Sequence, residues 1–528
     1  MTSEPMLWSG WGDPAKAREL PEQVRRLLHD LLGVRASAEP AAELESVRVP
    51  PAALEPRHLD ALAALVGDGH VLTTHEARVR HARGRSTPDL LRLRAGDGDG
   101  APDAVVLPGG HDEVARVLRL CAAERIAVVP FGGGTSVVGG LTAGRDGFAG
   151  VIALDLGRMN RLIEVDAESM TALFEPGMPA PEAERLLGAH GLTLGHFPQS
   201  FEYATLGGFA AARSSGQASA GYGRFDDMVA GLTVATPEGD LDLGRAPKSA
   251  AGPDLRQLVL GSEGAFGVIT SLRLRVRRAP AEKAYEGWRL PGFAAGTAAL
   301  RALAQDGPLP TVLRLSDETE TMIGLARPDR IGTGESGGSG GSGCLVIAGY
   351  EGASVAARRE AAAAVLSAHG GVPLGEEPGR SWAHGRFSAP YLRDSLLAAG
   401  ATVETLETAG FWANLPRLYD AVRLALLGAL GSPLVMCHIS HVYETGASLY
   451  FTVVTAQEGD PVAQWERAKE AVNAAIVEAG GTISHHHGVG RDHKAAYADE
   501  IGPLGVAILR AVKDRVDPAG VLNPGALV

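Results

Sequence analysis

The stretch Val128-Val129-Pro130-Phe131-Gly132-Gly133-Gly134-Thr135-Ser136-Val137-Val138-Gly139-Gly140 joins an apolar strand to a turn in which glycine dominates. Glycine has no Cβ atom, so consecutive peptides adopt dihedrals closed to other residues and point several backbone N–H groups into one concavity. Such a concavity suits an anion such as a diphosphate. Three glycines alone would indicate only an ordinary turn, but motifs later in the chain favour the anion site.

Two familiar nucleotide-binding loops fit this stretch poorly. A P-loop needs a lysine after its last glycine, whereas Thr135 and Ser136 follow the glycines here without a lysine nearby. A Rossmann turn opens directly into a helix and has an acidic residue about 20 positions later. Asp155 lies at about that distance, but the glycines run into a second glycine-rich turn at Gly139 and Gly140 instead of an amphipathic helix.

Composition narrows the classes of function. A chain of 528 residues is long enough for two or three domains. Its 49 basic and 62 acidic residues give a net charge of −13, which disfavours nucleic acid as a partner. Cys121, Cys344 and Cys437 are scattered without metal-ligand spacing, which predicts a reducing compartment and a cytoplasmic protein. No run approaches the roughly 20 apolar residues of a membrane span, so we expect any membrane contact to be peripheral.

The chain divides into four expected parts. They are a mainly helical segment (1–85), a glycine-rich α+β region (86–280), a second α+β region with longer helices (281–480) and a C-terminal segment (481–528). Local patterns predict helices over residues 22–32, 112–125 and 501–516, and strands over residues 104–108, 126–130, 151–156, 434–443 and 448–454. The Gly- and Ser-rich residues 332–343 predict a mobile surface loop.

Three glycine-rich segments in a fixed order carry a family resemblance. They are the first loop, the segment Thr205-Leu206-Gly207-Gly208, and the segment Gly261-Ser262-Glu263-Gly264-Ala265-Phe266-Gly267-Val268-Ile269-Thr270. Together they resemble the flavoenzyme family of vanillyl-alcohol oxidase and D-lactate dehydrogenase. Within it the chain is similar to the alkyldihydroxyacetonephosphate synthases, from Trp8-Ser9-Gly10-Trp11-Gly12 to Asn523-Pro524-Gly525. The distinctive marks are residues 197–202, residues 213–216 and Ser484-His485-His486-His487-Gly488-Val489-Gly490.

The resemblance implies an FAD cofactor and an α+β fold of the vanillyl-alcohol oxidase type. Residues 86–280 would form a two-subdomain FAD-binding domain, residues 281–480 a cap that binds substrate, and residues 481–528 a segment that returns to the flavin. Relatives that attach FAD covalently from the first loop place a histidine where this chain has Thr135, so we expect non-covalent FAD. The implied cofactor-binding residues are Pro130, Gly132, Gly133, Gly134, Thr135, Ser136, Val137, Pro198, Thr205, Gly207, Gly208, Ser215, Gly216, Glu263, Gly264, Gly267 and Ile269.

His485, His486 and His487 are three consecutive imidazoles before a glycine turn. In an extended segment His485 and His487 would point one way and His486 the other. A metal site helped by Asp492 and His493 is one interpretation, but two imidazoles separated by one residue make a weak ligand set. Histidines hydrogen-bonded in a packed turn are a second. The resemblance favours a third, a cluster for acid/base catalysis and phosphate binding, and we predict no metal.

Three further residues match family positions. Tyr450, on the second strand of the predicted hairpin, matches the active-site tyrosine of the synthases; an ordinary strand tyrosine with a solvated hydroxyl is the alternative. Arg314 and Arg393 match family arginines whose guanidinium groups suit a dianionic phosphate. Either arginine could instead pair with an acid such as Asp394. The predicted catalytic residues are Tyr450, His485, His486, His487 and Arg393, and the predicted substrate-binding residues are Arg314, Arg393 and His486.

The activity implied by the resemblance is formation of an ether bond without net oxidation. The acyl chain of acyl-dihydroxyacetone phosphate would be exchanged for a long-chain alcohol through an adduct at flavin N5. An apolar tunnel, an apolar patch for peripheral membrane contact and a homodimer are further expectations. The alternatives are an FAD-dependent dehydrogenase or oxidase of a 2-hydroxy acid or alcohol, which the same fold hosts, and a flavin- or lipid-binding protein without catalysis.

Overall fold

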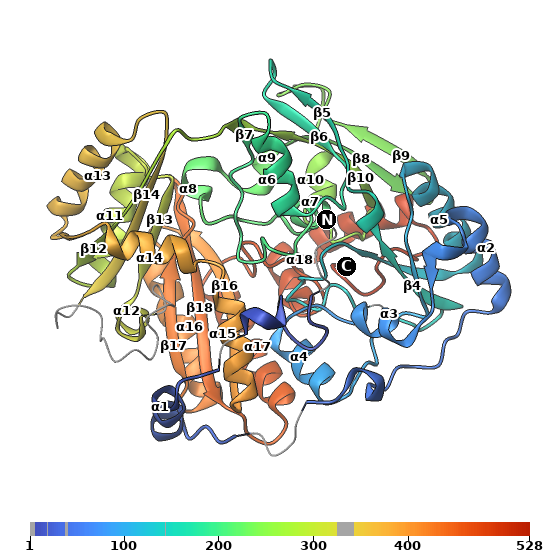
Figure 1. The fold of residues 1–528 in the computed structure, drawn as a ribbon, viewed down its shortest axis with the longest axis horizontal. Coiled ribbons are helices and arrows are strands. Elements are labelled where there is room, and N and C mark those ends of the chain that lie inside the picture. Colours follow the sequence, from blue (N-terminus) through green and yellow to red (C-terminus); the bar gives the residue numbers. More distant parts are fainter. Residues whose placement is uncertain (1–5, 18, 37–40, 143, 325–342) are drawn as a thin grey trace.

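The computed structural model describes residues 6–17, 19–36, 41–142, 144–324 and 343–528. Figure 1 shows two lobes: a first lobe built on small sheets and a second lobe built on one large antiparallel sheet. The predicted α+β class is confirmed. Of the predicted mobile loop, residues 332–342 lie outside the described residues.

A four-stranded sheet in the order β1-β2-β4-β3 begins the first lobe. Its strands β2, β3 and β4 are parallel, and β1 is antiparallel to β2. Helices α2 and α5 bury apolar stripes against this sheet, including Leu62, Val117 and Leu118. The bounds are Val71–Leu72 for β1, Ala104–Val106 for β2, Ile126–Phe131 for β3, Gly150–Asp155 for β4, Pro56–Val66 for α2 and His111–Glu124 for α5.

An antiparallel five-stranded sheet in the order β5-β6-β10-β8-β9 completes the first lobe, beside a short pair of strands, β7 and β11. Its core contains Phe174, Phe209 and Phe225. The strands are β5 (Leu162–Asp166), β6 (Thr171–Phe174), β7 (Leu192–Thr193), β8 (Val229–Thr236), β9 (Gly239–Leu243), β10 (Val268–Arg275) and β11 (Arg277–Arg278).

The second lobe is a seven-stranded antiparallel sheet in the order β15-β12-β14-β13-β17-β18-β16. Helices α11, α13, α16 and α17 cover one face, where fully buried side chains such as Leu300 and Phe451 each contribute about 1.5–3 kcal/mol of hydrophobic stabilisation. The strands are β12 (Glu282–Leu290), β13 (Val312–Ser316), β14 (Cys344–Gly352), β15 (Val372–Gly375), β16 (Ala401–Phe411), β17 (Leu434–Ile439) and β18 (Gly446–Ala456).

The other helices connect these layers. Early in the chain they are α1 (Glu22–Leu32), which packs on the second lobe, and α3 (His75–Arg80), α4 (Thr87–Arg94), α6 (Ala180–Gly188), α7 (Leu206–Ala212), α8 (Ser219–Tyr222), α9 (Phe225–Met228) and α10 (Arg256–Val259). Later in the chain they are α11 (Phe293–Asp306), α12 (Glu318–Ile323), α13 (Ala356–Ala368), α14 (Glu377–Gly385), α15 (Ala389–Ala398), α16 (Leu415–Leu430), α17 (Pro461–Glu478) and α18 (Lys494–Val516). Single 3-10 turns span Pro14–Lys16, Leu44–Ser46, Asp68–His70 and Leu156–Arg158.

The C-terminal segment crosses back to the first lobe. Val128 on β3 donates its N–H to the carbonyl of Val521 and accepts a hydrogen bond from the N–H of Asn523, at 2.8 Å each. Asn523 Nδ2 also donates to the carbonyl oxygens of Gly140 and Glu263. The chain terminus therefore supports the two glycine-rich segments from behind.

Most predicted elements are confirmed, and one helix start is wrong. The predicted helix 22–32 coincides with α1, and the predicted helix 112–125 is shifted by one residue in α5. The helix predicted from residue 501 is part of α18, which begins at Lys494 and is broken at Gly502 (φ 71°). Pro503 follows the break because proline cannot continue a helix from the preceding turn but fits the first turn of a new one. The domain boundaries stay predictions; β11 ends at Arg278 and β12 begins at Glu282.

Candidate active site

One cavity of about 1050 Å³ lies between the lobes and is lined by both. The seven-stranded sheet contributes alternate residues of two strands: Met436 and His438 on β17, and Tyr450 and Thr452 on β18, line the cavity. Their neighbours in sequence, such as Phe451, lie in the core on the opposite face. Because successive strand residues point to opposite faces, the hairpin pattern itself selects which residues reach the cavity.

The first glycine loop forms one wall with unused backbone donors. Across the described parts of the chain, the backbone N–H groups of residues 132–140 find no protein acceptor. The hydroxyl of Ser136 is also buried without a partner. Gly132 and Gly133 pass so close to Thr205 and Tyr203 that a Cβ atom would lie 2.4 Å from Thr205 Oγ1 and 1.9 Å from the Tyr203 carbonyl oxygen. This concavity of amide donors fits a diphosphate.

The other two glycine segments meet this loop. Thr205 caps α7 by accepting a hydrogen bond from the Gly208 N–H at 3.3 Å. Glu263 has a positive φ of 51°, and its carboxylate accepts hydrogen bonds from the N–H groups of Val489 and Gly490 at 2.9 and 2.6 Å. Burial raises the pKa of Glu263 to about 7. Glu263 thus joins the cofactor wall to the segment that carries the histidines.

The structure brings almost all predicted site residues to this cavity. Those that line it are Pro130, Gly132, Gly133, Gly134, Thr135, Ser136, Val137, Pro198, Thr205, Gly207, Gly208, Ser215, Glu263, Gly264, Gly267, Ile269, Arg314, Arg393, Tyr450, His486 and His487. Gly216 and His485 do not line it. At Gly216 the backbone packs closely on Phe197 and His196, and His485 is turned toward Tyr443.

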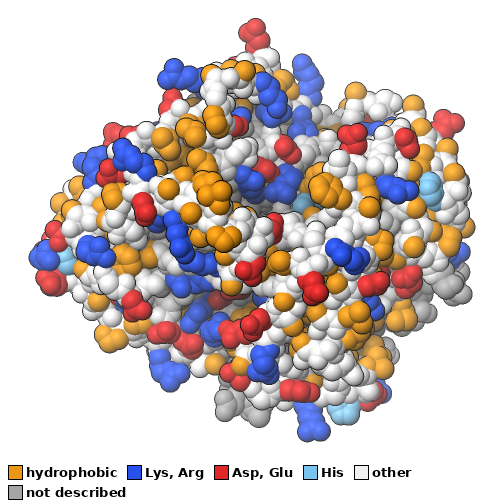
Figure 2. All heavy atoms as spheres, turned by 180° about the vertical axis from the view of Figure 1, so that it is seen from behind, with side chains coloured by type: hydrophobic (Ala, Val, Ile, Leu, Met, Phe, Trp, Pro, Cys, Tyr) orange, Lys and Arg blue, Asp and Glu red, His pale blue; other side chains and the backbone are white. Residues whose placement is uncertain are grey.

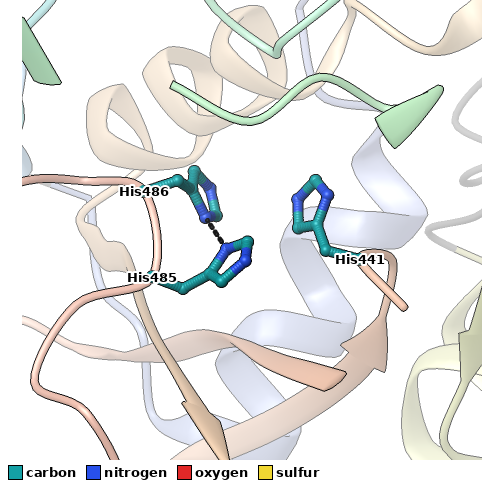
Figure 3. A group of neighbouring side chains, drawn as sticks. All are labelled: His441, His485 and His486. Atoms are coloured by element: carbon teal, nitrogen blue, oxygen red, sulfur yellow. Dashed lines mark hydrogen bonds between the residues drawn. The ribbon is translucent and has the colours of Figure 1, made fainter. Parts of the chain in front are cut away.

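The histidine turn, residues 484–488, is not an extended segment, so the predicted alternation of the three imidazoles is wrong. His486 and His487 both line the cavity, whereas His485 lies behind them. Figure 3 shows His485 and His486 facing one another, with their Nδ1 atoms 3.0 Å apart. The turn bends because Glu407 on β16 collects its backbone N–H groups on one side.

A chain of hydrogen bonds links the side chains in this turn. Tyr443 OH lies 2.6 Å from His485 Nε2, and His485 Nδ1 lies 3.0 Å from His486 Nδ1. Burial raises the pKa of Tyr443 to about 12, so its hydroxyl keeps its proton at physiological pH. The hydroxyl and each imidazole can act as donor or acceptor in this chain. Burial lowers the pKa of His486, and it lowers that of His487 to about 3, so both rings are neutral at physiological pH.

His441, which follows β17, joins this cluster. Its ring stacks on His485 at 4.9 Å between centroids, and its Nδ1 lies 2.7 Å from Ser219 Oγ and 3.0 Å from Ser215 Oγ. One nitrogen from each of His441, His485 and His486 lies within 4.8 Å of the others (Figure 3), which is the spacing of a possible metal site. Asp492 and His493 do not join it, because Asp492 pairs with Lys469 and His493 Nδ1 contacts the Gly488 carbonyl oxygen.

A second polar cluster surrounds Tyr450. The ring of His438 stacks on Tyr450, and Arg314 Nη2 lies 2.9 Å from His438 Nδ1 and 2.8 Å from Glu320 Oε1. Burial alone would raise the pKa of Glu320, but Arg314 and His438 hold it at about 2. Burial raises the pKa of Tyr450 to about 12, so its phenol is protonated at physiological pH.

Arg393 joins the lobes. Its Nε and Nη2 contact Asp394 Oδ1 at 3.2 and 3.1 Å, and Nη1 donates to the Arg85 carbonyl oxygen at 2.6 Å. The pairing with Asp394 that the sequence left open is therefore present. Asp394 also accepts a hydrogen bond from the Trp11 N–H at 2.5 Å.

Sequence reasoning missed several cavity residues. Trp11 and Arg85 both line the cavity, and within the part of the chain that the structure describes their buried Nε1 and Nε atoms have no hydrogen-bond partner. His438 and Glu320 were also missed. The Trp-x-Gly-Trp-Gly motif drew attention to Trp11 without a role. His438 lies directly opposite Tyr450 on the neighbouring strand, so the two side chains lie on the same face of the sheet. The hairpin pattern could therefore have predicted His438 as a cavity residue.

The far end of the cavity is apolar. Val24, Leu28, Leu396, Met436 and Val454 pack together and line it. Two side chains of α1 and one of α12 line this end and are also exposed to solvent: Leu27 at 49%, Leu31 at 64% and Met322 at 74%. The cavity therefore has an apolar opening at the surface. On the face shown in Figure 2, acidic and basic side chains are interspersed.

Known proteins share both the sequence and this architecture. The family described as FAD binding domain matches residues 102–242, and the family described as FAD linked oxidases, C-terminal domain, matches residues 279–527. The chain is 32% identical to the alkyldihydroxyacetonephosphate synthase of Dictyostelium discoideum, with 99% of this chain and 93% of that protein covered. It is 31% identical to that of Trypanosoma brucei brucei, with 99% and 92% covered. The chain belongs to the alkyldihydroxyacetonephosphate synthase family.

Solved structures agree with this membership. A structure of an alkyldihydroxyacetonephosphate synthase is 29% identical, with a TM-score of 0.83 and 99% of both chains covered. The 4-ethylphenol oxidase of Gulosibacter chungangensis, 16% identical with a TM-score of 0.69 over 89% of this chain and 96% of that one, shares the fold. The predicted fold of the vanillyl-alcohol oxidase type, the FAD cofactor and the flavoenzyme class of this family are thereby confirmed. None of the helices in the described ranges has the length and apolar character that crossing a membrane requires.

Proposed function

We propose that this enzyme exchanges the acyl chain of acyl-dihydroxyacetone phosphate for a long-chain alcohol, forming an ether without net oxidation. Family membership supports the reaction. The observation that carries it is the single cavity that joins the glycine loops, the neutral imidazoles and an apolar opening. A flavin-dependent reaction between an acylated phosphate and a long-chain alcohol needs all three, because it requires a cofactor site, groups that exchange protons and space for apolar chains.

The cofactor would lie against the unused N–H groups of residues 132–140, with Thr205, Ser136 and Glu263 beside it. Gly133 packs closely on Tyr203, and Gly264 of the third segment packs closely on Pro130, so glycines allow the segments to approach each other. When bound, reduced FAD supplies N5 as a nucleophile toward C1 of the substrate.

The phosphate would be held by donors on the cap side. Among the described residues the buried Nε of Arg314 has no hydrogen-bond partner, and the imidazole of His486 lines the same cavity. Arg393 also lines the cavity. Guanidinium groups and a neutral imidazole donor together suit a dianion.

Two neighbouring groups have opposite proton roles. His487 is neutral and accepts the O–H proton of the incoming alcohol, while Tyr450 is protonated and donates a hydrogen bond to a substrate oxygen. Their rings are 5.7 Å apart. The C1–O bond to the acyl group breaks, its electron pair leaves with the fatty acid carboxylate, and the alcohol oxygen forms the new bond to C1. This assignment follows the protonation states, since His487 is unprotonated and Tyr450 is protonated at physiological pH.

The apolar opening would contact a membrane. Leu27, Leu31 and Met322 surround it, and long-chain substrates reside in lipid. Replacing Leu27 and Leu31 with serine should reduce co-sedimentation with lipid vesicles while activity on detergent-solubilised substrate is retained. Unchanged co-sedimentation would contradict this contact. The homodimer and the cytoplasmic location stay predictions.

The deciding experiment measures electron balance. The purified FAD-loaded protein is incubated with acyl-dihydroxyacetone phosphate and hexadecanol without an electron acceptor, and the ether product is detected by mass spectrometry. Stoichiometric ether and fatty acid are expected. Bleaching by 2-hydroxy acids, with turnover only when an acceptor is added, would favour the dehydrogenase instead.

A further inference from the structure

Glu407 lies on β16 beneath the histidine turn, and its side chain is fully buried. The turn is held over β16 because the Thr482 N–H donates to the Ala409 carbonyl oxygen and Thr408 Oγ1 donates to the Thr482 carbonyl oxygen. Glu407 does not line the cavity, although His486 and His487 do. Its carboxylate therefore faces the back of the turn.

Four donors of the turn converge on this carboxylate. Oε1 accepts from Ser484 Oγ at 2.8 Å, from the His486 N–H at 3.1 Å and from the His487 N–H at 2.9 Å. Oε2 accepts from the His485 N–H at 2.7 Å. Three consecutive amides can share one carboxylate only if the backbone bends around it, so this anion and the shape of the turn depend on each other.

Groups of opposite charge hold the donors and an acceptor of the turn. Within the described ranges, the basic side chains within 4 Å of the Glu407 carboxylate are imidazoles: His486 Nδ1 at 3.6 Å and His487 Nδ1 at 3.9 Å. Burial alone would raise the pKa of Glu407, but the imidazoles and the amides of the turn hold it well below its usual range. On the opposite side, Arg224 Nη1 donates to the His485 carbonyl oxygen at 2.8 Å. An anion thus holds the amides of the turn and a cation holds a carbonyl group.

We propose that Glu407 is a positioning residue, whose buried carboxylate folds residues 484–488 into the turn that places His486 and His487 in the cavity. It does not act on substrate itself, because its side chain is separated from the cavity by the turn. The sequence offers no direct sign of this role, since Glu407 lies 78 residues before His485.

The variant Glu407→Gln tests this inference. Glutamine keeps the shape of the side chain, but its amide nitrogen is a donor and faces N–H groups that need an acceptor. Hydrogen exchange of the FAD-loaded enzyme, followed by mass spectrometry, reports directly on the amides of residues 485–487. We expect these amides to lose protection and kcat to fall about 100-fold. FAD affinity should change less than threefold, whereas KM for acyl-dihydroxyacetone phosphate should rise, because His486 is displaced from the proposed phosphate site.

Glu286→Gln is the matched control. Glu286 lies on β12 in the same sheet, is also buried, and accepts hydrogen bonds from Trp288, Tyr350 and Arg359, which do not line the cavity. This variant should leave exchange in residues 485–487 and kcat unchanged even if it lowers the melting temperature. Glu407→Asp keeps the charge, so it should recover part of the protection of these amides from hydrogen exchange and part of kcat. If Glu407→Gln does not accumulate, Glu407→Asp alone tests the inference.

Wild-type protection of residues 485–487 in both Glu407 variants would overturn the inference. So would a fall in kcat no larger than in Glu286→Gln. The kinetic part rests on the proposed function, whereas the exchange measurement needs no substrate. Loss of protection in an enzyme that forms no ether would therefore reject the proposed function and leave the positioning role of Glu407 standing.

Discussion

The imidazole of His438 stacks on the phenol ring of Tyr450, with ring centroids 4.8 Å apart and planes inclined by 23°. The two residues lie opposite one another on β17 and β18. Arg314 and Glu320 hold the far side of His438. The phenol therefore has a fixed orientation in the cavity wall.

Replacing Tyr450 with phenylalanine should lower kcat about 100-fold to 10,000-fold, because the ring stays stacked while its protonated hydroxyl is lost. Steady-state ether formation measures kcat, and flavin absorbance after gel filtration measures FAD retention, which we expect to be unchanged. Tyr285→Phe is the control, since Tyr285 bonds Glu351 outside the cavity. Activity of Tyr450→Phe close to that of the control would show that the hydroxyl has no chemical role.

Arg314→Lys should raise KM for the phosphorylated substrate by about 10-fold, because lysine cannot keep the contacts with Glu320 and His438 and also reach the phosphate. Arg393→Lys should raise KM less and lower the melting temperature more, since Arg393 ties Asp394 to Arg85 across the lobes. Initial rates at varied substrate concentration and thermal unfolding separate the two effects. Arg423→Lys, at an arginine that does not line the cavity, is the reference. If Arg314→Lys and Arg423→Lys have the same KM, Arg314 does not bind the phosphate.

The sequence predicted the site residues whose position depends on their own segment. The run of glycines around Gly133 was predicted from local geometry and Tyr450 from its match to a family tyrosine, and both line the cavity as expected. The orientation of the three imidazoles did not follow, because it is decided by Glu407, which lies far away in the sequence and bends the turn.

The sequence did not predict the residues that reach the cavity through contacts between distant segments. Trp11 reaches the cavity because Asp394 of the second lobe accepts its backbone N–H, and Arg85 reaches it because its own N–H donates to the Ser136 carbonyl oxygen. Neither contact leaves a periodic or compositional signal. Gly216 shows the opposite case: its motif suggested cofactor contact, but its close packing on Phe197 accounts for the glycine.

Gly133→Ala should weaken FAD binding at least 10-fold, because the new Cβ atom would lie 1.9 Å from the Tyr203 carbonyl oxygen and the loop must move. Overpacking of this kind costs about 1–3 kcal/mol. Titration of the apoprotein with FAD, followed by flavin fluorescence, measures the affinity. Gly188→Ala, at an exposed helical position with nothing within 4 Å, should leave the affinity unchanged. Wild-type affinity in Gly133→Ala would mean that this loop does not form the cofactor wall.

Glu263 should make the stability of the protein depend on pH. Burial raises its pKa to about 7, so between about pH 4.5 and 7 the folded state holds a proton that the unfolded state has lost. The stability from this group is therefore complete below the unfolded pKa and is lost as the pH rises through 7, a change on the order of 3 kcal/mol. Glu263→Gln should flatten the fall in melting temperature across this range, measured with FAD saturating. The exposed Glu458→Gln should keep the wild-type slope, and the same slope in Glu263→Gln would show that Glu263 does not titrate in this range.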